Sequence, residues 1–466
     1  MKSLDQVLSG RHVGVFAAAA LTVLVILSLT HPVALLIVGG FPLVAWMMIT
    51  AARRFVLVIG GAFAVLQSTD GLSAAKFGYF VIFLICLALS ATRLQNHLEN
   101  PSMAPWRSIR WLCPGLAFYF SATSAIAVSH GSTLENWLRD IISYMLLATI
   151  PVLVVDAAAG LGRRGAARLV AVAGLLGAVG FSVSWLSRRG VSDLPLAHLV
   201  FPSLALCVVP FAYALTKALT GRASRARWGL LATSILTFLL VTGTRTSVVF
   251  VVSLLAVVGR KSKNLASLAR VAAIVVPLTI GVVAGVVLIA GHLVSNDEFL
   301  PRRLNALSAV FSTDGATRDE SYLIRRQAYD NALDAWRKDP LFGAGPGYLY
   351  PTADGSGRSG TTLDTPYLIL SKFGLVGTLV IAGYLLAFLM NTRRSRLVVG
   401  YSTTSTTVRT STLIFIALFP FGQLLDDKGM PIGLALLLLL VIVDLRERYE
   451  PLHSHPQITD EITPKA

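Results

Sequence analysis

Apolar runs of roughly 20 residues recur from one end of this 466-residue sequence to the other, and they limit the fold more than any other feature. A helix needs about 20 mainly apolar residues to cross ~30 Å of hydrocarbon. Most of the runs lack the alternating pattern of a membrane barrel strand, so helices are the expected spanning element. Only 14% of the residues are charged, whereas soluble domains carry about 25%. Most of the chain is therefore expected to lie in the membrane.

The runs predict an all-α integral membrane protein, a polytopic bundle of about fourteen (12–14) transmembrane helices with one large external loop. The first run has no small-residue cleavage site before the next begins, so a retained helix is expected rather than a signal peptide. The predicted spans are 12–29, 33–50, 55–68, 77–92, 111–129, 140–158, 169–186, 196–216, 228–242, 246–258, 271–291, 365–390, 411–425 and 430–444.

Lysine and arginine are distributed unevenly among the loops that these spans define. Cytoplasmic loops carry an excess of both residues, and with the N-terminus inside, the cytoplasmic segments hold 25 of the 40 basic residues against six in the short outside loops. Both termini are therefore predicted to be cytoplasmic. The net charge of +16 is mainly a topology signal, and no nucleic-acid partner is expected, because neither a basic face nor a recognisable binding module accompanies it.

One predicted outside loop is much longer than the others, and it contains a helical pattern at about 318–338. Tyr322, Tyr329, Leu333 and Trp336 form one apolar stripe there, which indicates an amphipathic helix. The predicted organisation is a first part of the transmembrane bundle at 1–291, the large external loop at 292–364, the last part of the bundle at 365–444 and a cytoplasmic tail at 445–466.

Arg245 lies in a short turn, residues 243–247, that interrupts an apolar stretch too long for one span. Thr246 and Ser247 open the next helix, so a guanidinium, hydroxyl groups and a helix N-terminus would meet at the outer membrane surface. That combination suits a phosphate. An arginine that only snorkels to the interface would explain the same pattern.

Arg325 and Arg326 are adjacent on the predicted loop helix, with Tyr329 one turn further on. Two guanidinium groups at such positions could clamp a diphosphate. They could equally pair with neighbouring carboxylates on a solvated helix. The available carboxylates are Asp319, Glu320 and Asp330.

Asp364 stands where the long loop re-enters the membrane. A carboxylate at this place can accept a proton from a sugar hydroxyl. It is also a plain N-cap for the following helix, which has Pro366 in its first turn. His198 and His292 lie near the outer face, where each could assist or be a bystander. No Cys/His/Asp cluster has the spacing of a metal site, and no nucleotide-binding fingerprint is present.

Together these features resemble the O-antigen ligase/polymerase superfamily of bacterial membrane glycosyltransferases. The family's Gly/Ser-x-Arg-Gly/Thr turn corresponds to 243–247, and its arginine three residues before an aromatic to Arg326 and Tyr329. The Pro-Leu-x-Gly-x-Gly turn corresponds to 340–345. A polar motif before Tyr-Leu and a downstream Gly-Leu/Ile-x-Gly correspond to 364–368 and 374–377. The resemblance covers about 230–390.

The resemblance implies a bacterial inner-membrane enzyme that polymerises undecaprenyl-diphosphate-linked repeat units at the outer membrane surface, with no metal or other cofactor. Asp364, Arg245 and Arg326 would be catalytic, and Arg245, Arg325, Arg326 and Tyr329 would bind the diphosphate. The implied partners are the lipid-linked glycan donor, a glycan acceptor, membrane lipid, and a chain-length regulator and flippase of the same pathway.

Three alternatives remain open at this stage: a ligase, a transporter or flippase, and an inactive scaffold for envelope assembly. Ligases of the family, which move a glycan to lipid A core, usually have His-Asn where this chain has Asp364-Thr365, and this departure favours a polymerase. A transporter or flippase would instead show ionisable residues at mid-membrane and broken helices in paired halves. Asp156 and Lys372 lie nearer the ends than the middle of their predicted spans.

Overall fold

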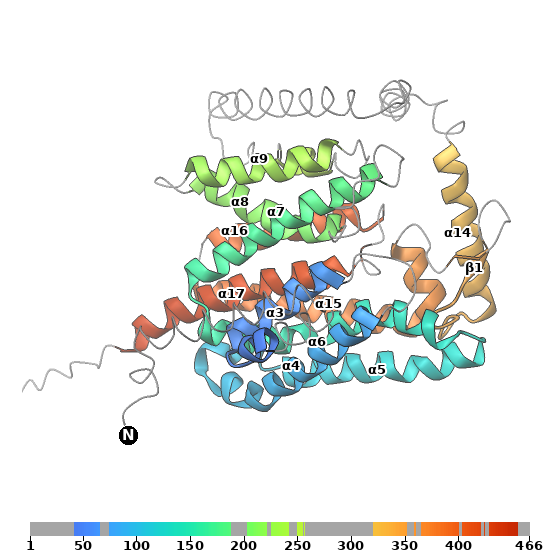
Figure 1. Cartoon of the computed structure of the whole chain (residues 1–466), viewed down its shortest axis with the longest axis horizontal. Helices are drawn as coiled ribbons and strands as arrows, with labels where there is room; N and C mark the ends of the chain where they lie inside the picture. The colour runs from blue at the N-terminus through green and yellow to red at the C-terminus, as the bar shows by residue number, and fades with distance from the viewer. Residues whose placement is uncertain are drawn as a thin grey trace, which may run out of the picture.

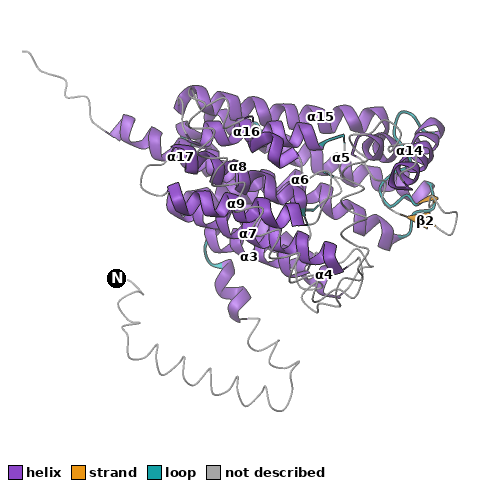
Figure 2. Cartoon of the chain, turned by 90° about the horizontal axis from the view of Figure 1, so that it is seen from above, coloured by secondary structure: helices purple, strands orange, loops and turns teal. Residues whose placement is uncertain are grey.

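The structure is a computed structural model, and nearly all of its described part is helical (Figure 2). Two strands, β1 (Tyr350–Pro351) and β2 (Arg358–Ser359), pair antiparallel at one edge. The prediction of an all-α protein is thus confirmed for this part of the chain. The described residues are 42–65, 74–187, 203–220, 225–241, 249–254, 256, 320–351, 358–359, 365–399, 403–420, 424 and 428–454.

The helices run side by side in a bundle, except that α14 stands across one end of it (Figure 1). Their bounds are α3 Ala51–Val65, α4 Ala74–Glu99, the short 3₁₀ helix η2 Pro101–Trp106, α5 Ile109–Ser129, α6 Leu134–Gly160, α7 Arg163–Ser187, α8 Leu204–Thr220, α9 Arg225–Val241, α14 Glu320–Lys338, α15 Thr365–Val399, α16 Thr403–Leu418 and α17 Gly429–Ser454.

Six helical stretches in the described residues are long and apolar enough to cross a membrane. They overlap the predicted spans 77–92, 111–129, 140–158, 169–186, 365–390 and 430–444. The shorter apolar helix α8, Leu204–Thr220, overlaps the predicted span 196–216 and ends four residues beyond it. The predicted spans 12–29 and 271–291 lie outside the described residues, as do parts of several others. The total of about fourteen spans therefore stays a prediction.

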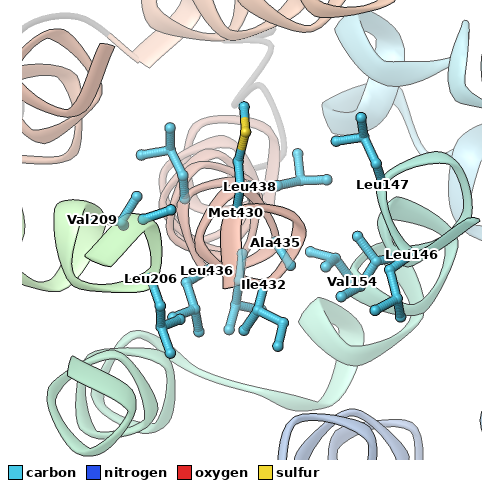
Figure 3. Close-up of a cluster of buried hydrophobic side chains, with 14 of the residues drawn as sticks. Leu146, Leu147, Val154, Leu206, Val209, Met430, Ile432, Ala435, Leu436 and Leu438 are labelled. Carbon is cyan, nitrogen blue, oxygen red and sulfur yellow. The ribbon is translucent and has the colours of Figure 1, made fainter. Parts of the chain in front are cut away.

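Helices α6 and α17 form the centre of the bundle. In their membrane-crossing windows 89% and 94% of the residues are buried, against 22% in α4 and 28% in the stretch that contains α5. Figure 3 shows α17 between α6 and α8, with Ile432, Ala435 and Leu436 among the side chains packed in the core. Because α4 and α5 leave large apolar side chains such as Phe118 exposed, they present the surface that suits lipid.

Helix α16 departs from the prediction. The apolar run placed a span at 411–425, whereas the helix occupies Thr403–Leu418. The hydroxyl-rich start reads as polar in sequence, yet Thr407 and Thr410 are buried. Thr407 Oγ1 donates to the carbonyl of Thr403 at 2.9 Å, so its hydroxyl is satisfied inside the helix. The helix ends before Pro420, as the residue preceding a proline disfavours helical backbone.

The bundle has two ends that carry different features (Figure 1). One end holds the C-terminus of α5, the start of α6, the start of α15, α14 and β1. The other holds the C-termini of α6, α8 and α17 with the starts of α7 and α16. We call these the outer end and the inner end, following the orientation that the cation distribution predicts.

Candidate functional site

At the outer end, the turn after α14 is joined to a break in α15. The helical path of α15 is interrupted at Gly374, where φ is 61°. The N–H groups of Ala344 and Gly345 donate to the carbonyls of Ser371 and Lys372 at 2.8 and 2.9 Å, on one side of the break. On the other side, Leu375 and Val376 donate to Pro340 and Leu341 at 3.0 Å each. The break thus exposes backbone groups of α15, and the turn satisfies them.

Glycine is required on both sides of this junction. Gly343 and Gly374 have positive φ, and a Cβ on Gly343 would lie 2.6 Å from the backbone nitrogen of Gly374. A side chain at either position would therefore collide with backbone as well as strain it. The Pro-Leu-x-Gly-x-Gly and Gly-Leu/Ile-x-Gly motifs, which are separate in sequence, are the two halves of one backbone contact.

A buried ion pair lies directly beneath the turn. Lys372 Nζ lies 2.6 Å from Asp140 Oδ2, and both side chains are almost completely buried. The same carboxylate oxygen accepts the N–H of Gly347 at 2.8 Å, and Oδ1 accepts Arg139 Nε at 3.1 Å. Asp140 therefore joins α6 to α15 and to the last glycine of the turn. A buried pair needs such additional hydrogen bonds to offset its desolvation.

Helix α14 confirms the predicted amphipathic helix and packs against the first turns of α15. Tyr329 stacks on Tyr367, with ring centroids 4.3 Å apart and planes at 15°. The most buried α14 residues whose side chains are described are the small Ala332 and Ala335, beside Tyr350, whereas Tyr329, Leu333 and Trp336 are half-buried. Small side chains at the contact let the two backbones approach closely.

Of the predicted site residues, Arg326 and Tyr329 are described with their side chains. Arg326 is exposed on α14, one turn before Tyr329, and its guanidinium forms no ion pair with the described residues. Arg245, Asp364, His198 and His292 lie outside the described residues, as does the side chain of Arg325. In sequence, Asp364 directly precedes Thr365, the first residue of α15.

A histidine that the sequence reasoning did not single out is also at the outer end. His130 follows α5, and its Nε2 lies 2.7 Å from Asp339 Oδ2 while Nδ1 lies 2.9 Å from the carbonyl oxygen of Ile126. Both ring nitrogens therefore face acceptors, an arrangement that suits the protonated imidazolium. The hydrogen bond to the Ile126 carbonyl is the main cause that raises the pKa of His130 above its ordinary value; partial burial opposes it, and Asp339 raises the pKa further.

Lys372 was interpreted as a charge near the end of its span, and Asp140 was not singled out in the sequence. A usable signal was present: opposite charges stand in two apolar runs at the same predicted membrane level, and ionisable residues within spans usually pair. For His130 and Asp339 the sequence offers no comparable signal, since 208 residues separate them. As for metals, no group of three ligating side chains occurs among the described residues.

The architecture and the six candidate spans define a multi-pass helical membrane protein. Residues 228–381 match the profile of the O-antigen ligase family and form a domain of that family. This confirms the resemblance drawn from the motifs, and the matched stretch contains α9, α14, the glycine turn and the broken start of α15. No curated protein matches the chain.

Proposed function

We propose that this protein is a glycosyltransferase that polymerises polyprenyl-diphosphate-linked glycan repeat units at the outer surface of the inner membrane. Enzymes of the O-antigen ligase/polymerase type act on lipid-linked glycans, and residues 228–381 belong to that family. The choice of polymerase rests on Asp364-Thr365, which stand where ligases of the family usually carry His-Asn.

The observation that carries the proposal is the stacking of Tyr329 on Tyr367. Arg326 precedes Tyr329 by three residues, and Asp364 precedes Tyr367 by three. This contact supports the proposal that Arg326 and Asp364, two of the three predicted catalytic residues, act at a common place. An exposed guanidinium without an ion-pair partner among the described residues is available to an anionic substrate.

The reaction is a displacement at the anomeric carbon of the lipid-linked glycan. A hydroxyl of the second glycan forms the new C–O bond as the bond from carbon to diphosphate oxygen breaks. Asp364 takes the hydroxyl proton. Arg245 and Arg326, with Arg325 beside them, neutralise the departing diphosphate, and fixed charges at such a place are often the largest contribution to catalysis.

Two other functions would require different features of the protein. A ligase would transfer the same donor glycan to lipid A core, so the acceptor alone separates it from a polymerase. A transporter needs ionisable groups along a mid-membrane path. The buried charges of α6 lie towards the two ends of this helix and are paired, and among the described helices the non-helical break is in α15.

The test uses Arg326→Ala in purified full-length protein supplied with lipid-linked repeat units. Loss of one charge-stabilising donor should lower the rate roughly 10²–10³-fold. Arg326→Lys should recover little, because an ammonium cannot reproduce a bidentate contact. Arg337→Ala is the matched control, since Arg337 is an exposed arginine of the same helix that pairs with Asp334. Equal activity of the Arg326→Ala and Arg337→Ala proteins would exclude Arg326 from the reaction, and product found only on lipid A core would make the enzyme a ligase.

A further inference from the structure

A small hollow, partly open to solvent, lies at the inner end among α7, α8, α16 and α17. Its charged lining residues are Arg163, Lys217, Asp444 and Arg448. Three cations thus surround one carboxylate. We call this hollow the inner-end pocket, and nothing in the proposed reaction at the outer end uses it.

The carboxylate of the pocket is already engaged. Asp444 Oδ1 accepts from the guanidinium of Arg163 and from Arg448 Nε, the latter at 3.2 Å. Arg163 is held further by Glu447, which accepts its Nε at 3.3 Å and its backbone N–H at 2.6 Å. Two carboxylates therefore hold the two arginines in place and leave positive charge in excess around the hollow.

Lys217 supplies the charge that the carboxylates do not balance. Its Nζ lies 5.6 Å from the ring centroid of Tyr213, and no carboxylate of the described residues lies within ion-pair distance of it. The ammonium group lines the hollow. Lysine binds phosphate as a point charge with three donors. Thr403 and Thr404, at the start of α16, add hydroxyl groups to the same lining.

The lining also includes the apolar side chains of Leu440 and Val443 of α17. A cationic hollow with apolar side chains in its lining suits the phosphate of a lipid headgroup and the carbon atoms next to it. Basic pockets between transmembrane helices on the cytoplasmic side are known to take anionic headgroups. We propose that the inner-end pocket binds the phosphate of an anionic phospholipid of the inner leaflet.

The experiment measures binding of phosphatidylglycerol and of zwitterionic phosphatidylcholine to the purified full-length protein by native mass spectrometry. The wild-type protein should retain phosphatidylglycerol in preference. Lys217→Met keeps the side-chain volume and removes the charge, so it should weaken phosphatidylglycerol binding by about tenfold or more. Arg164→Met is the control, because Arg164 is exposed beside Arg163 and does not line the pocket.

Three results would overturn the assignment. Equal retention of the two lipids by the wild-type protein would contradict the assignment. Equal weakening of phosphatidylglycerol binding in the Arg164→Met and Lys217→Met proteins would contradict it too, because diffuse surface charge would then attract the lipid. Inorganic phosphate that displaces the lipid at equal concentration would make this a site for a soluble anion. The unfolding temperature of each lipid-free variant, expected to match that of the wild-type protein, shows that lost binding is not lost folding.

Discussion

Helix α6 carries two buried carboxylates, and comparing them separates the two ends of the molecule. Asp140 and Asp156 are 16 positions apart, which is about 24 Å along a helix and close to the ~30 Å of the hydrocarbon layer. Each is paired with a buried cation: Lys372 at 2.6 Å for Asp140 and Arg54 at 2.5 Å for Asp156.

The surroundings of the two carboxylates differ. Asp156 accepts hydrogen bonds from side chains only, with Ser90 Oγ donating at 2.7 Å and His97 Nε2 lying 3.1 Å away, so it braces regular helices. Asp140 also binds the backbone of Gly347, in a turn whose glycines have positive φ beside a broken helix. Unusual backbone gathers at functional sites. The inner pair therefore serves stability alone, whereas the outer pair also sets the shape of the proposed site.

The largest effect is expected from removing the cation of each pair. Lys372→Met removes the buried cation of Asp140 and leaves Arg139 beside it, and Arg54→Met removes that of Asp156 and leaves His97 beside it. Each should lower the free energy of unfolding by up to about 3–5 kcal/mol. Only Lys372→Met should also lower the turnover per folded molecule. Thermal unfolding in detergent and turnover assays measure the two quantities separately.

The control for this prediction is the addition of Asp140→Asn to Lys372→Met. Neutralising the stranded carboxylate should restore most of the stability without restoring turnover. If Arg54→Met lowered turnover per folded molecule as much as Lys372→Met, the two ends would not differ in the way described above.

A smaller but measurable loss of turnover is expected from substitutions of Asp364. Two interpretations of this residue compete: proton acceptor and helix N-cap. Asparagine caps about as well as aspartate, and losing a cap altogether costs ~1 kcal/mol. An amide cannot act as the base, and general-base assistance is worth about 10²–10⁴-fold in rate. The Asp364→Asn and Asp364→Ala proteins should therefore both turn over at least ~100-fold more slowly than the wild-type protein. Their unfolding temperatures should be nearly unchanged. A near-normal rate in the Asn variant would leave Asp364 as a cap.

A weaker effect is expected from pH at the His130–Asp339 contact. Because the pKa of His130 is raised in the folded protein, its stabilising contribution is complete below its ordinary pKa and is lost as the pH rises through the raised value. Limited proteolysis at the end of α14 should accelerate as the pH rises from below the ordinary pKa of histidine through the raised pKa of His130. In His130→Gln this acceleration should disappear; a wild-type slope in that variant would assign the pH response to another group.

The last prediction concerns the orientation of the chain in the membrane. The cysteine substitutions that test it should change neither activity nor stability. A cysteine at Ser356 should react with an impermeant maleimide in cells whose inner membrane is intact, and one at Arg225 only after permeabilisation. The three native cysteines are buried and give little background. The reverse labelling pattern would mean that the outer end faces the cytoplasm. The proposed reaction at the outer surface of the inner membrane would then lose its basis.

The sequence predicts the helical class, six of the described spans and α14. It does so because the thickness of the hydrocarbon layer sets the length of apolar runs, and helical periodicity sets the spacing of apolar residues. It places the start of α16 wrongly, since buried threonines that bond to their own helix look like a polar loop. It also does not show that residues 340–347 and Gly374 meet. That contact joins backbone groups, and two short glycine motifs do not specify each other as partners.

The Asp140–Lys372 pair has a further consequence for how the chain is made. The two residues are 232 positions apart, so at about 5–20 residues per second of synthesis, lysine follows aspartate by roughly 10–50 seconds. Arg54 is made before Asp156, so the inner carboxylate enters the membrane with its cation already present. The outer carboxylate is made next to Arg139 but lacks its buried cation until Lys372 follows. During biogenesis the inner end can therefore close early, while the outer end remains unfinished until α15 has been inserted.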